Sequence, residues 1–196
     1  EEHEEINLIY GQSNYLAKMR KILTDEMVRN SDVFASEDYQ GYLIAFYLFD
    51  ETALRLALQE VDDQSLAVGM IYLDNYEEAL ASVEEVRRSL LTALIERKIN
   101  KYISSFDGIC KRLEKDKYMV VLRKKSMEMI EQDKFDLLED VKTVNIGNEM
   151  AVTVSIGIGL DGLTYAQNYE FARNAIDLAL GRGGDQAVVK LSLIHI

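Results

Sequence analysis

The sequence predicts an α+β fold in two layers, with helices packed on one mixed, mostly antiparallel sheet. Strand-length apolar runs alternate with apolar residues at helical spacing along most of the 196 residues. From residue 67 onward the predicted order is strand, helix, strand, strand, helix, strand, helix and strand. This is the split β-α-β arrangement of ferredoxin-like folds, extended at its C-terminal end. The apolar fraction of 48% is sufficient for a buried core at this length.

The first 60 residues predict a short hairpin followed by a helix. Residues 41–50 are rich in aromatic and branched side chains, which is typical of a strand. Residues 36–41 have the composition of a turn, and residues 33–35 are the strand expected to pair across it. Residues 51–60 predict a helix that leads out of this sheet. These elements are too few for a complete domain, so they indicate the last part of a small sheet and its exit helix.

The next segment predicts the central strand and a long helix. The continuous apolar run at residues 67–73 indicates a strand buried on both faces. Asp74 ends this strand. Ser82 and Glu85 fit a capping box, which predicts that a helix begins there. The helix then continues with an apolar stripe to about Tyr102.

The second half of the fold begins with a predicted hairpin. Two short strands, residues 108–113 and 118–122, are separated by the charged tetrad at residues 114–117. The elements after the hairpin are predicted from apolar spacing and run length in the same way. They are a helix over residues 126–141, a strand over 150–159, a helix over 165–180 and a strand over 186–191.

The composition excludes several kinds of site. A single cysteine, Cys110, excludes a disulfide framework and a multi-cysteine zinc site, and it fits a reducing compartment such as the cytoplasm. His3 and His195 lie near opposite ends, so neither a histidine-rich metal site nor a Ser-His-Asp triad is expected. The longest apolar run, residues 150–160, is shorter than the roughly 20 residues that span a bilayer. The acidic first residues are unlike a signal peptide.

The charge is unevenly distributed. The net charge of −12 disfavours nonspecific nucleic-acid binding, which depends on Lys and Arg side chains that neutralise phosphates. Residues 97–125, however, carry 10 basic and 3 acidic side chains. A basic stretch in an acidic protein is a candidate anion site, and its alternative is a solvated face.

Two glycine motifs and two carboxylates are candidate functional features. The string at residues 181–185 could cradle a phosphate, but it closes a helix, so a glycine cap and a tight turn are the favoured alternative. Residues 157–159 place Gly-x-Gly within a strand, which is typical of a close backbone approach or a bulge and is weak evidence for nucleotide binding. Asp74 and Asp116 could hold Mg²⁺. Their alternatives are a helix cap for Asp74 and a turn residue for Asp116.

Four strings occur in a specific order along the chain. They are Leu73-Asp74-Asn75-Tyr76-Glu77-Glu78, the hairpin at 114–118, residues 153–159, and residues 175–190 with Gly-Arg-Gly-Gly-Asp-Gln. Their order resembles a GGDEF domain, a nucleotidyl-cyclase palm. More narrowly, it resembles the degenerate GGDEF domain of membrane-bound cyclic-di-AMP phosphodiesterases of the GdpP/YybT type. The resemblance covers about residues 60–190.

The resemblance implies that the cyclase chemistry is lost. An active diguanylate cyclase holds its metal with two acidic residues, whose positions correspond here to Tyr72 and Lys117. The five positions of the GGDEF motif correspond to residues 114–118, which read Glu-Lys-Asp-Lys-Tyr and contain neither glycine. Tyr and Lys cannot replace carboxylates on Mg²⁺. No cyclase activity is therefore expected, and at most a weak ATPase.

The resemblance also implies a larger protein. By this resemblance the whole protein would contain, in order, two N-terminal transmembrane helices, a degenerate PAS domain, the degenerate GGDEF domain and a DHH/DHHA1 module. That last module would be Mn²⁺-dependent and would hydrolyse cyclic-di-AMP to pApA. Residues 1–60 would be the C-terminal part of the PAS-like domain and a connector helix, and residues 61–190 the degenerate GGDEF domain. Residues 191–196 depart from the family pattern and are expected to be a non-native tail. The segment would lie at the cytoplasmic face of the membrane.

The expected role of this segment is regulatory, with ATP or GTP as its ligand. The candidate binding residues are Asp74, Asn75, Arg112, Lys115, Asp116 and Lys117, with Arg123, Lys124 and Lys125 adding charge beside the hairpin. Asp74 and Asp116 are weak candidates for a Mg²⁺ contact, and no catalytic residue is assigned. The alternatives are a stand-alone nucleotide-binding or weak ATPase module and a dimerisation spacer. The expected partners are the protein's own PAS and DHH/DHHA1 domains and a second copy in a homodimer, and no nucleic acid.

Overall fold

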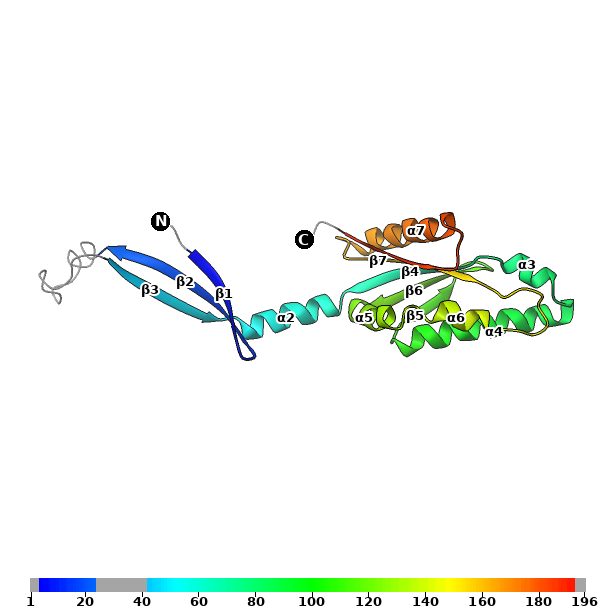
Figure 1. Cartoon of the computed structure of the whole chain (residues 1–196), viewed down its shortest axis with the longest axis horizontal. Coiled ribbons are helices and arrows are strands. Elements are labelled where there is room, and N and C mark those ends of the chain that lie inside the picture. The colour runs from blue at the N-terminus through cyan, green and yellow to red at the C-terminus, as the bar shows by residue number, and fades with distance from the viewer. Residues whose placement is uncertain (1–3, 24–41, 193–196) are drawn as a thin grey trace, which may run out of the picture. The chain divides into compact units, whose positions relative to one another are not determined.

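Strand β4, Leu66–Leu73, is the centre of a five-stranded sheet in the computed structural model, which describes residues 4–23 and 42–192 (Figure 1). The order is β5-β6-β4-β7-β8, and only β7 and β8 pair in parallel. The fold class is therefore confirmed as a mixed α+β sheet. The other strands are β5 Ile109–Arg112, β6 Lys117–Arg123, β7 Val154–Leu160 and β8 Ala187–Leu191.

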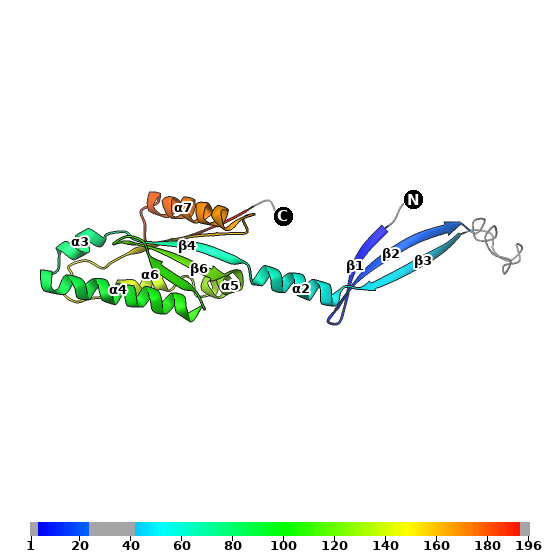
Figure 2. The same cartoon turned by 180° about the vertical axis from the view of Figure 1, so that it is seen from behind.

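Helices lie on both faces of this sheet. Helix α4, Glu85–Ser105, buries Leu91, Ile95 and Ile99 against one face. Helix α7, Tyr165–Gly181, packs on β7, β4 and β8 on the other face and so adds a layer to the expected two (Figure 2). β4 contributes to the core on both faces of the sheet, because apolar side chains alternate between them: Ala67 and Ile71 lie in one cluster, and Val68 and Met70 in the other. The larger core combines α4 with α5, α6 and the side chains of Ile71, Val120, Ile156 and Ile158.

Gly157 and Gly159 allow α7 to approach β7 closely. A Cβ at Gly157 would lie 2.4 Å from the backbone nitrogen of Ile176. A Cβ at Gly159 would lie 2.1 Å from the carbonyl oxygen of Asn168. The close backbone approach predicted from Gly-x-Gly is confirmed.

Helix α4 begins later than predicted. A short helix, α3 Tyr76–Ala81, precedes it, and the N-cap of α4 is Glu84. The Ser82 hydroxyl donates to the carbonyl of Ala79 at 2.7 Å, so it closes α3 instead of opening α4. The predicted capping box is therefore wrong.

The predicted helix over residues 126–141 is two helices. α5 spans Lys124–Gln132 and α6 spans Leu137–Lys142. Between them Lys134 and Phe135 adopt left-handed φ values of 55° and 56°, and the Phe135 N–H donates to the carbonyl of Ile130 at 3.1 Å. Apolar spacing alone does not reveal this break, because Phe135 still packs against the core.

The glycine string after α7 forms a helix cap and a turn. The N–H of Gly183 donates to the carbonyl of Leu180, and that of Gly184 to the carbonyl of Ala179, both at 3.0 Å. Gly183 and Gly184 have φ values of 107° and 77°, which glycine adopts without strain. The favoured alternative for this motif is confirmed.

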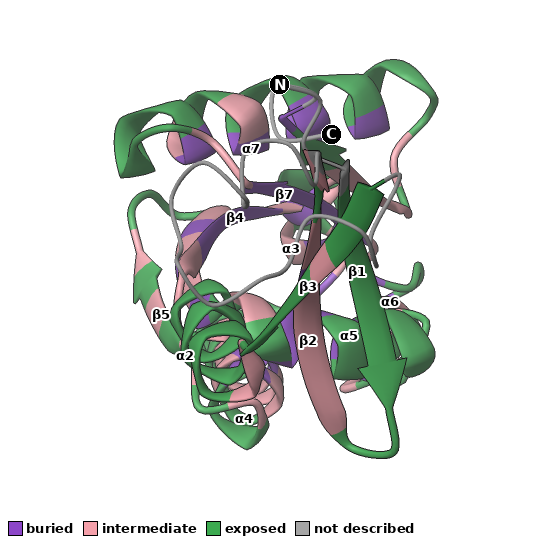
Figure 3. Cartoon of the chain, turned by 90° about the vertical axis from the view of Figure 1, so that its left-hand side faces the viewer, coloured by how far each residue is buried: buried purple, intermediate pink, exposed green. Residues whose placement is uncertain are grey.

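The first unit, residues 1–61, contains a three-stranded antiparallel sheet in the order β1-β2-β3. The strand predicted at residues 41–50 is confirmed as β3, and the helix predicted after it as α2. The partner of β3 is β2, which the sequence did not predict, while the strand expected at 33–35 and its turn lie outside the described residues. β1 and almost all of β3 are exposed (Figure 3). The bounds are β1 Glu4–Tyr10, β2 Ser13–Leu23, β3 Tyr42–Asp50 and α2 Thr52–Asp63.

Among the helices of the described residues, none combines the length and the apolar character needed to cross a membrane.

The Cys110 thiol is expected to react slowly. Burial, with a smaller effect from the charge of Glu96, raises its pKa to about 11. At pH 8 the reactive thiolate is therefore about two hundredfold scarcer than in an unfolded chain with a pKa of about 8.5. We expect iodoacetamide to alkylate the native protein about two hundredfold more slowly than the guanidinium-unfolded chain, and the native rate to rise tenfold per pH unit up to about pH 10.

A native alkylation rate that levels off near pH 9 would contradict this prediction.

The raised pKa of Cys110 also makes the stability of the fold depend on pH. Because the unfolded thiol ionises more readily, its contribution to stability is complete below about pH 8.5 and is progressively lost as the pH rises toward 11.

Candidate functional site

The candidate site lies where β4 ends. Tyr72 is the next-to-last residue of β4, and Asp74 is the first residue after this strand. The N–H of Leu73 donates to the carbonyl of Asp116 at 2.9 Å, which holds the tip of the β5–β6 hairpin beside this strand end. The N–H of Asp185 donates to the Asp74 carboxylate at 2.9 Å, which brings the glycine turn to the same place. Three segments far apart in the sequence therefore meet at one end of the sheet.

Asp74 holds the glycine turn. Its Oδ2 accepts the Asp185 N–H, and its Oδ1 is buried without a hydrogen-bond partner in the part of the chain that the structure describes. Gly184 packs directly on this carboxyl group, because a Cβ at Gly184 would lie 2.9 Å from the Asp74 Cγ. The alternative role as a helix cap is wrong, since α3 has Asn75 as its N-cap and no side-chain cap bond. Asp74 is thus a positioning residue for the turn.

Asn75 fixes the segment before β7. Its Nδ2 donates to the carbonyl of Ala151 at 2.8 Å, and its Oδ1 accepts the N–H of Thr153 at 3.0 Å. This side-chain bridge continues the contact one residue beyond the backbone bond from the Asp74 N–H to the Thr153 carbonyl at 3.0 Å, and β7 itself begins at Val154 and not at residue 150 as predicted. Both ends of the Asn75 amide are engaged within the chain.

Asp185 also ties the glycine turn to α6. Its carboxylate lies 2.7 Å from the Lys142 Nζ, which is 2.7 Å from Glu139 as well. The hydrogen bond to Asp185, followed by that to Glu139, raises the pKa of Lys142. The backbone N–H of Asp185 is therefore held by Asp74, just after β4, and its carboxylate by Lys142 of α6.

An ammonium and an aromatic ring lie side by side at this end of the sheet, where Lys117 of β6 pairs with Tyr72 of β4. The Lys117 Nζ lies 5.4 Å from the centre of the Tyr72 ring and 2.7 Å from the Glu114 carboxylate. The hydrogen bond to Glu114 raises the pKa of Lys117. Burial raises the pKa of Tyr72, so its hydroxyl is neutral at pH 7. The side chain of Lys115 is exposed, and we find no ion pair for it within residues 4–23 and 42–192.

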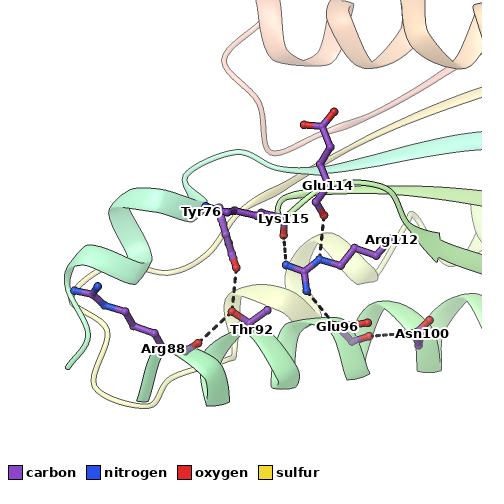
Figure 4. A network of polar contacts seen from close by, with 8 residues as sticks. All are labelled: Tyr76, Arg88, Thr92, Glu96, Asn100, Arg112, Glu114 and Lys115. Carbon is purple, nitrogen blue, oxygen red and sulfur yellow. Dashed lines mark hydrogen bonds and ion pairs between the residues drawn. The ribbon is translucent and has the colours of Figure 1, made fainter. Parts of the chain in front are cut away.

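Arg112 clamps the hairpin tip (Figure 4). Its Nε donates to the carbonyl of Glu114 at 3.0 Å and its Nη2 to the carbonyl of Lys115 at 2.6 Å. Its Nη1 lies 3.5 Å from Glu96 of α4, and the guanidinium stacks 5.9 Å from the Tyr118 ring. Arg112 is therefore committed to internal contacts, and its role in the hairpin is structural.

The expected basic patch is divided. Arg123 and Lys124 lie at the other end of β6, opposite Leu66, and Lys125 follows them. All three are paired with carboxylates, at 3.1 Å from Asp107 for Arg123, 2.7 Å from Asp161 for Lys124 and 3.9 Å from Asp63 for Lys125. Seven residues of strand span about 23 Å, so these cations do not reinforce the hairpin. The expectation that they add charge beside it is wrong.

The carboxylates here do not fit a magnesium site. Within the described ranges, no group of three or more His, Cys, Asp or Glu side chains is placed to hold a metal ion. The ammonium of Lys117 lies at this end of the sheet as well, 5.4 Å from the centre of the Tyr72 ring. A protonated amine there repels a divalent cation.

These residues lie in a recognisable domain. The family model for the GGDEF domain of GdpP-like cyclic-di-AMP phosphodiesterases matches residues 71–193. The chain belongs to this family. The resemblance inferred from the strand end, the hairpin and the glycine string is thereby confirmed.

Relatives of this GdpP-like GGDEF domain include whole phosphodiesterases. The chain is 29% identical over 144 residues to a cyclic-di-AMP phosphodiesterase GdpP of Geobacillus thermodenitrificans, and 31% identical over 144 residues to the cyclic-di-AMP phosphodiesterase PdeA of Listeria monocytogenes. Each match covers 74% of this chain and 22% of the relative. The chain thus spans about a fifth of the length of these proteins.

Solved structures show the same fold. An active GGEEF domain of a diguanylate cyclase from Vibrio cholerae has a TM-score of 0.56 at 16% identity, covering 69% of this chain and 89% of that domain. The GGDEF domain of DgcB from Caulobacter crescentus, solved with c-di-GMP, has a TM-score of 0.55 at 13% identity, covering 71% and 86%. At these identities the likeness shows the fold alone.

One residue of this GdpP-like site was missed. Lys142 was not predicted, because it comes from α6, and no spacing in the sequence connects α6 with the glycine turn. Asp185 was noted only as part of the glycine string. Its N–H donates to Asp74, and the peptide plane that carries this N–H follows Gly184, whose φ is 77°.

Proposed function

We propose that this chain is the regulatory, non-cyclase segment of a membrane-bound cyclic-di-AMP phosphodiesterase that hydrolyses cyclic-di-AMP to pApA. The observation that carries the proposal is the GdpP-like GGDEF domain with Tyr72 and Lys117 at the cyclase metal positions. Residues 1–60 are the end of a PAS-like domain with its connector helix, and 191–196 a non-native tail. The manganese-dependent hydrolysis belongs to a DHH/DHHA1 module, whose Asp-His-His motif this sequence does not contain.

Loss of cyclase activity follows from the hairpin. By the resemblance, Glu114 and Lys115 correspond to the glycines of the cyclase motif, so a nucleotide cannot approach the backbone there as closely as in a cyclase. The Lys117 ammonium, paired with Glu114, cannot bind Mg²⁺. The purified chain is expected to make no cyclic-di-GMP from GTP.

The same lysines support binding of a nucleotide phosphate. Lys115 is exposed and without an ion pair in the described part of the chain, and the carboxylate that Lys117 contacts, that of Glu114, is exposed. A polyphosphate carries several charges, so it can replace this single carboxylate. The ligand class is therefore ATP or GTP, bound through its phosphates at the hairpin tip.

Titration with a fluorescent ATP analogue tests the binding site. Replacing both lysines, in Lys115→Ala/Lys117→Ala, is expected to weaken binding about tenfold or more, since two charged hydrogen bonds are lost. The matched control is Lys101→Ala/Lys134→Ala, which removes two exposed lysines outside the hairpin and should leave the affinity unchanged. Equal affinities for all three proteins would refute the phosphate site.

The full-length enzyme tests the regulatory role. Cyclic-di-AMP hydrolysis that responds to ATP in the wild type and not in Lys115→Ala/Lys117→Ala supports it. If the chain binds no nucleotide and light scattering shows a stable dimer, the segment is a dimerisation spacer. The observation that favours this second function is the exposed apolar stripe of α2, formed by Leu54, Leu58 and Val61.

A further inference from the structure

The last turn of α2 has an unfavourable charge for its position. Asp62 and Asp63 lie at the C-terminal end of this helix, and the turn contains no basic residue. Unpaired carbonyls give a helix C-terminus a partial negative charge, so carboxylates there destabilise the last turn. The turn depends on cations from another part of the chain.

Lys124 supplies the main compensating charge. Its Nζ lies 3.0 Å from the Asp62 carboxylate and 2.7 Å from that of Asp161, in the turn after β7. Its backbone N–H donates to the carbonyl of Ser65 at 2.7 Å, just after α2. The side chains of Lys124 and Asp161 are 27% and 24% exposed, so solvent screens this pair less than a free surface pair. A weaker contact, 3.9 Å long, joins Lys125 to Asp63.

The ammonium of Lys124 is shared between Asp62 and Asp161, so releasing the end of α2 costs little free energy. When Asp62 leaves, Lys124 keeps its contact with Asp161, so no unpaired buried ammonium remains. A pocket of about 440 Å³ lies beside the three residues, with Ser65 and Asn168 also in its lining, and water in it can solvate the released carboxylate. Release and docking therefore differ by little free energy.

We propose that Lys124 is a latch for the connector helix. When it binds Asp62, α2 is helical to Asp63 and its end is attached to the sheet domain. When it binds Asp161 alone, the last turn of α2 unwinds and the link between the two units gains free residues. The charge competition at Lys124 thus sets the length of the rigid connector.

Hydrogen exchange of the whole chain, followed by mass spectrometry on peptides covering residues 58–66, tests the latch. Asp62→Asn breaks the ion pair with Lys124 and also relieves the repulsion between this carboxylate and the helix end. Because Lys124 is largely shielded from solvent, loss of the pair is the larger effect, and these amides should exchange about twofold faster. Asp161→Asn removes the competitor and should make them exchange more slowly than in the wild type. Asparagine tolerates the left-handed φ of 59° at position 161, so the turn after β7 is preserved.

Asp107→Asn is the matched control, because Asp107 pairs with Arg123 at 3.1 Å away from α2. It removes the same charge and should leave exchange in residues 58–66 unchanged. Sodium chloride at 1 M should accelerate exchange in the wild type and have little effect on Asp62→Asn. Equal exchange in Asp62→Asn and Asp107→Asn, or acceleration in Asp161→Asn as large as in Asp62→Asn, would overturn the latch.

Discussion

Gly159→Ala is expected to destabilise the second unit by about 3 kcal/mol, near the upper end of the usual cost of overpacking a core. The added Cβ would lie 2.1 Å from the carbonyl oxygen of Asn168 and 2.6 Å from the backbone nitrogen of Ala172. These are backbone atoms of α7, so no rotamer change can relieve the clash, and the helix must move away from β7. Urea unfolding followed by circular dichroism measures the loss.

The control is Gly181→Ala, at the C-terminal end of α7. A Cβ at Gly181 meets no atom within 4 Å, and alanine favours helix more than glycine does. This variant is expected to change the free energy of unfolding by no more than about 1 kcal/mol, in the stabilising direction. If both variants shift the urea midpoint equally, the close packing of α7 on the strand glycines does not determine stability.

Gly184→Ala is expected to cost about 3 kcal/mol, from two sources. A left-handed φ of 77° is unfavourable for alanine, at about 1 kcal/mol or more. The added methyl group also lies 2.9 Å from the Asp74 carboxyl, which must then release the Asp185 N–H, at about 1 to 2 kcal/mol. Thermal and urea unfolding measure the sum.

Two further variants separate these sources. Gly183→Ala has the left-handed φ without the contact, so it should cost only about 1 kcal/mol. Asp74→Ala removes the contact and the hydrogen bond, so Asp74→Ala/Gly184→Ala should cost about 1 kcal/mol less than the sum of the single variants. Strict additivity would show that Asp74 and Gly184 do not act as one unit.

Local patterns predicted most of the elements and few of their contacts. The apolar run of β4 and the helical spacing of α4 are strong signals, because burial on both faces or on one stripe leaves a periodic trace. The break at Lys134 and Phe135 left no such trace, since the apolar positions fit one helix as well as two. β2 was missed because its sequence, SNYLAKMRKIL, mixes polar and apolar residues without regular alternation.

The candidate site was predicted by residue type and corrected by geometry. Asp74 and Asn75 were singled out because they follow a central strand, but both use their side chains to hold other backbone segments. Arg112 was predicted to bind a nucleotide because of its charge, but its guanidinium donates to the backbone carbonyls at the hairpin tip instead. Pairings between elements more than 40 residues apart, such as Lys142 with Asp185, leave no local signature in a single sequence.

The position of β4 has a consequence for biosynthesis. Val68 pairs with Val121 on one side and with Gly159 on the other, so the second edge of the central strand stays open until β7 has been made. At a translation rate of about 5–20 residues per second, the stretch from Val121 to Gly159 takes roughly 2–8 s to synthesise. During that interval an apolar strand with one unpaired edge is exposed at the ribosome, where chaperone binding or pairing between nascent chains competes with folding.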